Sequence, residues 1–440
     1  LLFLDADEGD FNRFDIRPPE TRRLVAFDLE ERKTRTLLDA VDDYALSADG
    51  TAVVWRKGDA IGIVDSCAEK PEAAPLDLAG LTTTVDPRAE WKQIFREVWR
   101  VERDYFYDPG MHGLDWAAIG RKYEPLIDAA ASRVEVRWVL GEMIGELATS
   151  HTYVYGGDRR RKPETLPVGM LGADFAADPA SGRYRIARIL RTPDWKTGAL
   201  PPLAAPGVDA REGDLLIAVD GREVTTAKEV YAAFEGLADR PVRLTLASGG
   251  GAGARETLVV PAADESRFRY LDWVERNLAT VEKASGGKIG YLHLPDTFTG
   301  AAEMFPLYWY GQTRKKGLIV DGRYNGGGLD PDPFLNRMAN PIYYYWTRRY
   351  SHDYATPLVA TRAHLAMLTN RQAGSGGDHL PSQFQLKKMG PVFGTRTWGG
   401  LVGISMFVSL VDGGGITAPD YRVYSADGKW MIENEGGTPD

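Results

Sequence analysis

The sequence has few of the residues from which metal sites and disulfide frameworks are built. Cys67 is its single cysteine, and there are six histidines among 440 residues. One cysteine excludes an internal disulfide bond and a thiolate cage for a metal ion. No two histidines have the spacing that places a pair of zinc ligands on one helix. We therefore expect no metal, no other cofactor and no chemistry at cysteine.

The sequence also lacks an excess of positive charge and a long apolar run. Its 53 Lys and Arg residues face 62 Asp and Glu residues, a formal net charge of −9, which disfavours nucleic acid or an anionic membrane as the main partner. No stretch reaches the roughly 18 apolar residues of a spanning helix, and nothing near Leu1 resembles a signal peptide. We expect a cytoplasmic protein, and because Leu1 is not a methionine we also expect the natural chain to be longer.

What is present is the composition of an ordinary globular protein, with 43% apolar and 26% charged residues. A length of 440 residues predicts about three domains. Residues 1–85 consist of short alternating runs with a turn signal about every ten residues, which indicates antiparallel strands. The order of strands and turns is typical of β-propeller blades, of which fewer than two are present. We expect a truncated, propeller-like N-terminal piece.

A helical pattern begins at Trp91. Apolar residues recur at three and four residues from Trp91 to Trp99 and again from Val136 to Leu147, which predicts two amphipathic helices. Ser132 and Glu135 have capping-box spacing before the second of them. Residues 88–165 are therefore expected to form a helical domain that presents Ser150 and His151 just after its last periodic residue.

The period returns to two over residues 166–263. Strands are expected near 184–190, 215–219, 242–246 and 258–260, with a helix-like piece from Ala227 to Leu237. The segment from Glu212 to Gly221 resembles the second half of a PDZ domain, a fold that binds extended peptides by adding a strand to a sheet edge. This region is therefore interpreted as a PDZ-like β domain.

Residues 264–440 alternate buried-type strands with helical stretches. The expected strands lie at 289–294, 317–321, 365–369 and 406–410, and each ends near a glycine-rich or polar loop. This pattern predicts an α/β sandwich, and in α/β domains such loops hold the functional site. The whole chain is thus expected to be multidomain, with this last part as its catalytic domain.

Two of these loops have the composition of a catalytic turn. Ser375 stands between glycines after a predicted strand and before a predicted helix, a setting that can expose a nucleophile and offer the next amide to an oxyanion. The loop from Asp321 to Gly328 has three successive glycines but lacks the P-loop lysine. Either loop by itself is more often only a structural turn.

Several motifs occur in order, namely Trp99 to Asp108, Met111 to Trp116, Gly145 to His151, the PDZ-like segment, Asp321 to Gly328, Thr397 to Gly400 and Glu433 to Asp440. Together they closely resemble the tricorn protease family over residues 88–440. That resemblance implies a serine peptidase in which Ser375 is the nucleophile, His151 the general base, Ser150 its hydrogen-bond partner and Glu433 the residue that orients Ser150. The amide of Gly376 and one amide of Gly326 or Gly327 would form the oxyanion hole.

The choice of base has an independent check. The related C-terminal processing peptidases use a lysine in the element that here reads Trp398 to Leu401, and Gly400 cannot take a proton. If Ser375 is activated, its proton acceptor must come from elsewhere, and His151 is the candidate with family support. His379 is near Ser375 in sequence, but we expect it on the following helix, where it is the weaker candidate.

The sequence departs from the family pattern at two points. Gly376 stands where the family usually has Asp, and the segment after Glu433 lacks the usual apolar residue. No acidic residue matches the family's specificity pocket for basic side chains, so Asp330 and Asp332 are only weak substrate-binding candidates. The alternative function is a catalytically silent scaffold that binds peptides through the PDZ domain. The resemblance further implies peptide substrates and a homo-oligomer, commonly a hexamer.

Overall fold

The computed structural model describes residues 1–6, 22–69, 73–158, 165–249 and 253–440. They form two compact units, one of Leu1–Glu97 with Arg121–Ala129 and one of Val98–Gly120 with Ala130–Asp440. Within the described ranges, no helix combines the length and the apolar character needed to cross a membrane.

The start of the first unit is made of two three-stranded antiparallel sheets, as the alternating runs predict. Apolar side chains of both sheets, among them Leu24, Leu38, Val53 and Trp55, are buried in one shared core. These sheets confirm the expected antiparallel strands, whereas their origin in a propeller stays a prediction. The sheets are β1 (Leu2–Asp5), β2 (Arg23–Phe27) and β3 (Thr34–Leu38), and β4 (Asp43–Leu46), β5 (Ala52–Lys57) and β6 (Ala60–Asp65).

Both predicted amphipathic helices are confirmed. They are α1 (Pro87–Tyr105) and α3 (Arg133–Gly145), and the Ser132 hydroxyl caps α3 by accepting a hydrogen bond from Glu135 N at 3.3 Å. The periodicity gave no sign of α2 (Trp116–Ala129), which contains Pro125. A short 3-10 helix, η1 (Met111–Gly113), lies between α1 and α2.

The PDZ-like region is a β-sheet of order β13-β12-β10-β9-β8 around one apolar core. All four predicted strands are present, but the predicted helix of residues 227–237 is only η3 (Val230–Phe234), because the chain is still extended at Glu229 and turns at Gly236 with φ 70°. The elements are β8 (Ala173–Asp178), β9 (Arg183–Ile189), η2 (Pro202–Ala204), β10 (Leu215–Val219), β11 (Arg222–Glu223), η3, β12 (Val242–Ala247) and β13 (Arg255–Val259).

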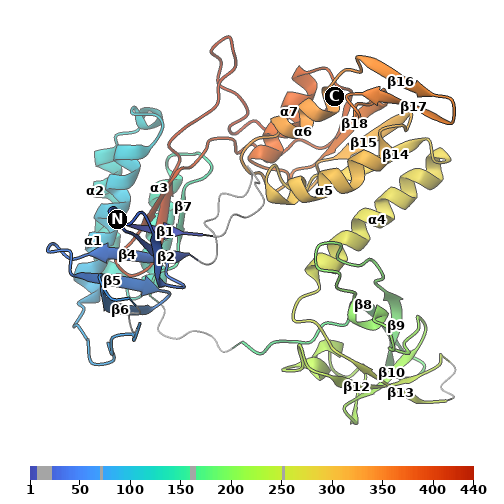
Figure 1. Cartoon of the computed structure of the whole chain (residues 1–440), viewed down its shortest axis with the longest axis horizontal. Coiled ribbons are helices and arrows are strands. Elements are labelled where there is room, and N and C mark those ends of the chain that lie inside the picture. The colour runs from blue at the N-terminus through green and yellow to red at the C-terminus, as the bar shows by residue number, and fades with distance from the viewer. Residues whose placement is uncertain (7–21, 70–72, 159–164, 250–252) are drawn as a thin grey trace. The chain divides into compact units, whose positions relative to one another are not determined.

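The C-terminal part contains a parallel sheet of order β14-β15-β18-β19 with helices beside it (Figure 1). Three of the four predicted strands belong to this sheet. Its elements are α4 (Ser266–Ser285), β14 (Ile289–His293), α5 (Thr299–Trp309), η4 (Tyr310–Gln312), β15 (Gly317–Asp321), α6 (Asp332–Ala339), β18 (His364–Thr369), α7 (Gly376–Leu386) and β19 (Val392–Gly394).

The expected strand at 406–410 is present but was assigned to the wrong sheet. It is β20 (Met406–Ser409), which pairs with β21 (Gly415–Ala418), and β21 pairs in turn with β7 (Tyr153–Tyr155). Its burial alternates between half-buried and exposed, as in a strand with one solvated face, and a parallel sheet buries both faces. The pairing of β7 with β21 brings the segment after His151 to the C-terminal part of the chain.

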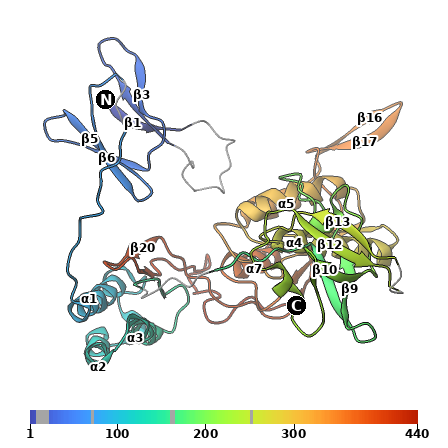
Figure 2. The ribbon, with the colours of Figure 1, turned by 90° about the horizontal axis from the view of Figure 1, so that it is seen from below.

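A two-stranded hairpin, β16 (Tyr344–Arg348) and β17 (Ser351–Thr356), extends away from the parallel sheet (Figure 2). All five residues of β16 are exposed.

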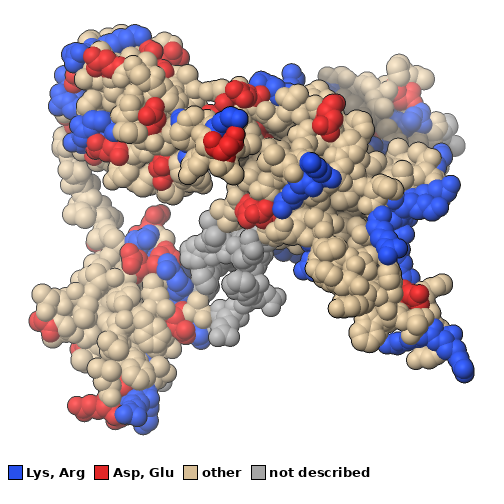
Figure 3. Space-filling view, turned by 90° about the horizontal axis from the view of Figure 1, so that it is seen from above, with Lys and Arg blue, Asp and Glu red and all other residues tan. Residues whose placement is uncertain are grey.

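On the face seen in Figure 3, basic and acidic side chains are both spread over the surface.

A buried ion pair joins α3 to the β20–β21 turn. Arg133 Nε donates to Asp412 Oδ2 at 2.5 Å, and the two side chains are 6% and 1% exposed. Asp412 also accepts hydrogen bonds from the amides of Gly414 and Asp158. The arginine and these amides together hold the pKa of Asp412 below its usual value against the effect of burial. The pair therefore fixes the end of the β7–β21–β20 sheet.

Substitution Asp412→Ala is expected to lower the free energy of unfolding by about 3–5 kcal/mol, because it leaves the Arg133 charge buried without a partner. Denaturant unfolding of the full chain measures this change. The control Glu256→Ala breaks an exposed pair with Arg243 and should leave the transition nearly unchanged. An Asp412→Ala transition equal to that of the control would show that the pair does not hold this sheet.

Candidate active site

Ser375 and the loop of residues 322–328 follow the carboxyl ends of parallel strands. The loops after β14, β15, β18 and β19 meet at one edge of the sheet, where α/β folds place their sites. Asn325, which is fully buried, ties three of these loops together. Its Nδ2 donates to Leu294 O at 2.9 Å, its Oδ1 accepts from Gly327 N at 2.9 Å, and its carbonyl oxygen accepts from Gly374 N at 3.1 Å.

Ser375 lies on a strained turn between β18 and α7. Its φ of 56° and ψ of −119° are unusual for a residue with a side chain. Helix α7 begins at the next residue, Gly376, so the turn has the strand, serine and helix order of a nucleophile elbow. The loop with the three glycines of residues 326–328, called the glycine loop below, packs closely against this turn, since a Cβ atom on Gly327 would lie 2.6 Å from Ser375 Cβ.

His151 follows the end of α3, as the sequence predicts, and is 9% exposed. Ser150 Oγ lies 2.7 Å from His151 Nδ1, and the His151 carbonyl accepts a hydrogen bond from Thr417 Oγ1 at 2.8 Å. Burial lowers the pKa of His151, and the charges of Glu433 and Asp378 oppose this effect. The histidine is thus kept in the neutral form that a general base needs.

The Glu433 carboxylate accepts five hydrogen bonds. Oε1 accepts from Thr149 Oγ1 at 3.1 Å and Ser150 N at 2.7 Å. Oε2 accepts from Ser150 Oγ at 3.2 Å, Leu401 N at 2.7 Å and Val402 N at 3.0 Å. Burial works to raise the pKa of Glu433, but the backbone donors outweigh it and hold the pKa below its usual value. The structure therefore brings Glu433, Ser150 and His151 into one hydrogen-bonded chain.

A second carboxylate holds the neighbouring part of the same loop. Asp378 on α7 is fully buried and accepts from Gly399 N at 2.7 Å and Gly400 N at 3.1 Å. Together with Glu433 it binds four successive amides, those of residues 399–402. The backbone of this segment is therefore held by two carboxylates.

Trp398 contacts both halves of the candidate catalytic pair. Its ring centroid lies 5.6 Å from that of His151. On the nucleophile side, a Cβ atom on Gly374 would lie 2.7 Å from Trp398 Cε3, and Trp398 N donates to Ala373 O at 2.9 Å. Among the described residues, no hydrogen bond joins Ser375 Oγ to His151. Trp398 therefore contacts His151 and the turn before Ser375, while Ser375 and His151 are not hydrogen-bonded to each other in this conformation.

Two of the three amides predicted for the oxyanion hole already donate a hydrogen bond within the protein. Gly326 N donates to Pro295 O at 2.8 Å and Gly327 N to Asn325 Oδ1 at 2.9 Å. In the part of the chain that the structure describes, the amides of Gly376 and Gly328 have no acceptor. In this conformation the available second donor is therefore Gly328, which the sequence analysis did not name.

Asp330 and Asp332 lie near His379 on α7. Burial lowers the pKa of His379, and the charges of these two aspartates oppose the shift. His379 Nε2 lies 2.9 Å from Gln383 Nε2, so this histidine is engaged along its own helix. The two aspartates are close to the helix that follows Ser375.

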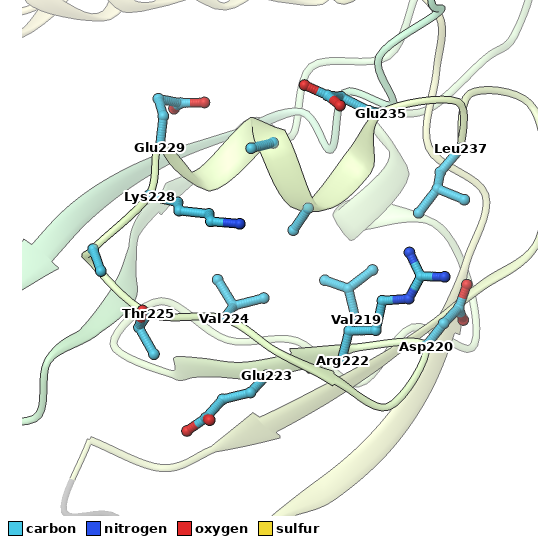
Figure 4. A pocket seen from close by; sticks show the side chains of 13 residues that line it. Val219, Asp220, Arg222, Glu223, Val224, Thr225, Lys228, Glu229, Glu235 and Leu237 are labelled. Carbon is cyan, nitrogen blue, oxygen red and sulfur yellow. The ribbon is translucent and has the colours of Figure 1, made fainter.

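The PDZ-like sheet has a cavity of about 800 Å³ between the β10–β11 hairpin and η3. Figure 4 shows Val219, Val224 and Lys228 pointing into it. The edge strand β8 is not among the elements that line this cavity. At the start of β8, two backbone groups are hydrogen-bonded to side chains at the start of α4. Gly172 N donates to Glu265 Oε2 at 2.7 Å, and Ala173 O accepts from Arg269 Nη2 at 3.0 Å.

Besides Gly328, three residues of the site were missed by the sequence analysis. Thr149 precedes the predicted Ser150 and His151 directly, and Asp378 follows Ser375 on the same turn of chain, so proximity to the motifs was an available signal. Thr297, whose buried hydroxyl lies beside Gly376, has no such signal, because it follows a different strand.

Comparison with known proteins matches this architecture in three consecutive parts. Residues 87–145 match the tricorn protease C1 domain, residues 169–264 the tricorn protease PDZ domain, and residues 288–440 peptidase family S41. A match to the crystal structure of the tricorn protease covers 100% of this chain and 42% of that one, with a TM-score of 0.85 and 29% identity.

Curated relatives give the same result. Tricorn protease homolog 1 of Streptomyces coelicolor is 34% identical over 435 residues, which cover 96% of this chain and 40% of the relative. The tricorn protease of Thermoplasma acidophilum is 31% identical over 445 residues, which cover 100% of this chain and 41% of the relative. The chain spans about two fifths of the length of these relatives. By these matches the chain belongs to the tricorn protease family of serine peptidases, and its C-terminal part is a family S41 peptidase domain.

Proposed function

We propose that this chain hydrolyses peptide bonds through a Ser-His-Ser-Glu relay and an acyl-enzyme. The observation that carries the proposal is the hydrogen-bonded chain from Glu433 through Ser150 to His151 Nδ1. It fixes one ring nitrogen and leaves Nε2 to accept the proton of the attacking nucleophile. The strained backbone of Ser375 supports its role as that nucleophile.

In the first half of the reaction, Ser375 Oγ forms a bond to the substrate carbonyl carbon and gives its proton to His151 Nε2. The carbonyl π electrons move to the oxygen, which becomes an oxyanion. The C–N bond then breaks, and the amine leaves with the proton from His151. Water repeats the sequence on the ester, releasing the acid and restoring Ser375.

The oxyanion is proposed to bind at the amide of Gly376 and a second amide of the glycine loop. Gly326 and Gly327 would serve only after leaving Pro295 O and Asn325 Oδ1, whereas Gly328 needs no such exchange. Asp330 and Asp332 are proposed as the acidic side of the substrate site. Their effect on the pKa of His379 supports a position beside the nucleophile helix.

The substrates we propose are oligopeptides or unfolded chains, with the PDZ domain guiding them. We further propose a cytoplasmic homo-oligomer, up to a hexamer. These proposals rest on family membership, and light scattering of the full chain tests the oligomer. A monomer at working concentration would contradict it.

Substitution Ser375→Ala is expected to reduce hydrolysis of a short fluorogenic peptide by on the order of 10⁵- to 10⁶-fold, because the nucleophile is lost. A fluorophosphonate should label the native chain at Ser375 and leave the variant unlabelled. Thermal unfolding of both chains serves as the control, since one hydroxyl on a half-buried turn contributes little to stability. A folded native chain that is neither labelled nor active would support the alternative, a peptide-binding scaffold.

The pH profile should show His151 as the base. Burial lowers its pKa, so kcat/KM should rise with pH through a value below the ordinary histidine pKa of about 6.5. Glu433→Gln removes a negative charge that raises the His151 pKa, so the rise should move to lower pH. The plateau should fall by about 10- to 10⁴-fold, because Glu433 orients and does not transfer protons. A rise shifted to higher pH in this variant would contradict the assignment.

A further inference from the structure

Thr297 lies on the loop between β14 and α5, directly beside the glycine loop. Its amide donates to Gly327 O at 2.8 Å, and the residue forms an isolated parallel bridge with Gly328. Thr297 itself is fully buried. The backbone of Thr297 thus holds the loop that supplies the second oxyanion amide.

The hydroxyl of Thr297 is buried and has no hydrogen-bond partner within the described ranges. A buried hydroxyl without a partner destabilises a fold, since it has lost its bond to water. Valine has the same shape and would avoid this cost. Such groups are rare, and a role in catalysis is one recognised reason for their presence.

The hydroxyl shares a small space with the two available oxyanion amides. A Cβ atom on Gly376 would overlap Thr297 Oγ1 and would lie 3.1 Å from Gly328 N. Gly327 is buried, whereas Gly328 is exposed. The glycine loop therefore reaches the surface beside this space. Gly328 N and Thr297 Oγ1, two donors without acceptors in the described structure, therefore both lie against Gly376, the residue directly after Ser375.

We propose that Thr297 is a further catalytic residue, whose hydroxyl donates a third hydrogen bond to the oxyanion formed when Ser375 attacks. The proposal rests on the proposed peptidase function. The charge appears as the carbonyl π electrons move to oxygen, and the Thr297 proton stays on its hydroxyl throughout. A hydroxyl can rotate toward the charge as it forms, so its bond is made in the transition state and not in the ground state.

The same geometry explains why position 376 is glycine in this chain. The Thr297 hydroxyl occupies the space that the first atom of any side chain at 376 would need. Glycine at 376 therefore leaves room for the Thr297 hydroxyl beside the turn that carries Ser375.

The test compares Thr297→Val with Thr297→Ser in the full chain. Thr297→Val should lower kcat on a short fluorogenic peptide by about 10²-fold with KM unchanged, as for loss of an oxyanion donor. The rate of labelling by a fluorophosphonate should fall in parallel, because the tetrahedral adduct places an oxygen in the same site. The unfolding temperature of Thr297→Val should equal or exceed that of the native chain. Thr297→Ser keeps the hydroxyl and should retain native kcat.

Each other outcome has a defined meaning. Native kcat and labelling in Thr297→Val would overturn the proposal, and so would a lower unfolding temperature or failure to fold, since either shows a structural role. Equal loss in Thr297→Ser would show that the hydroxyl is not the cause. A folded native chain that is neither labelled nor active would refute the proposed function itself, and with it the role of Thr297.

Discussion

The Glu433 carboxylate is the group on which the rest of the site depends. It binds Ser150 by backbone and side chain, Thr149 by its hydroxyl, and the amides of Leu401 and Val402. These donors come from segments more than 200 residues apart, and a single half-buried anion satisfies them. Because the ionised carboxylate accepts five bonds, its loss would release the loop after α3 and the loop after β19 together.

Asp378 extends this arrangement to the nucleophile. It lies three residues after Ser375 and binds the two amides next to those bound by Glu433. Trp398, at the start of the same loop, contacts the His151 ring and the turn before Ser375. The loop of residues 398–402 therefore lies between the proposed base and the turn that carries the proposed nucleophile.

In the conformation described here, the proposed base is oriented by Ser150, and burial favours its neutral form. Among the described residues no hydrogen bond joins Ser375 to His151, and the amides of Gly326 and Gly327 are bound to Pro295 O and Asn325 Oδ1. The proposed mechanism requires Ser375 to reach His151 and a glycine amide to meet the oxyanion. Such a site exchanges internal hydrogen bonds for substrate bonds when a peptide binds, and this fits a loop made of residues with free backbone rotation.

The sequence by itself determined the two amphipathic helices and most strands, and it predicted Ser375, His151, Ser150 and Glu433 as site residues. Period and turn chemistry are local properties, and the motifs are carried by short segments. Only the tertiary structure decided which sheet β20 joins, that α2 exists despite Pro125, and that the Gly328 amide and the Thr297 hydroxyl are available beside Ser375. Strand partners, loop hydrogen bonds and the pairing of a buried hydroxyl depend on residues far apart in the chain, and no local pattern records them.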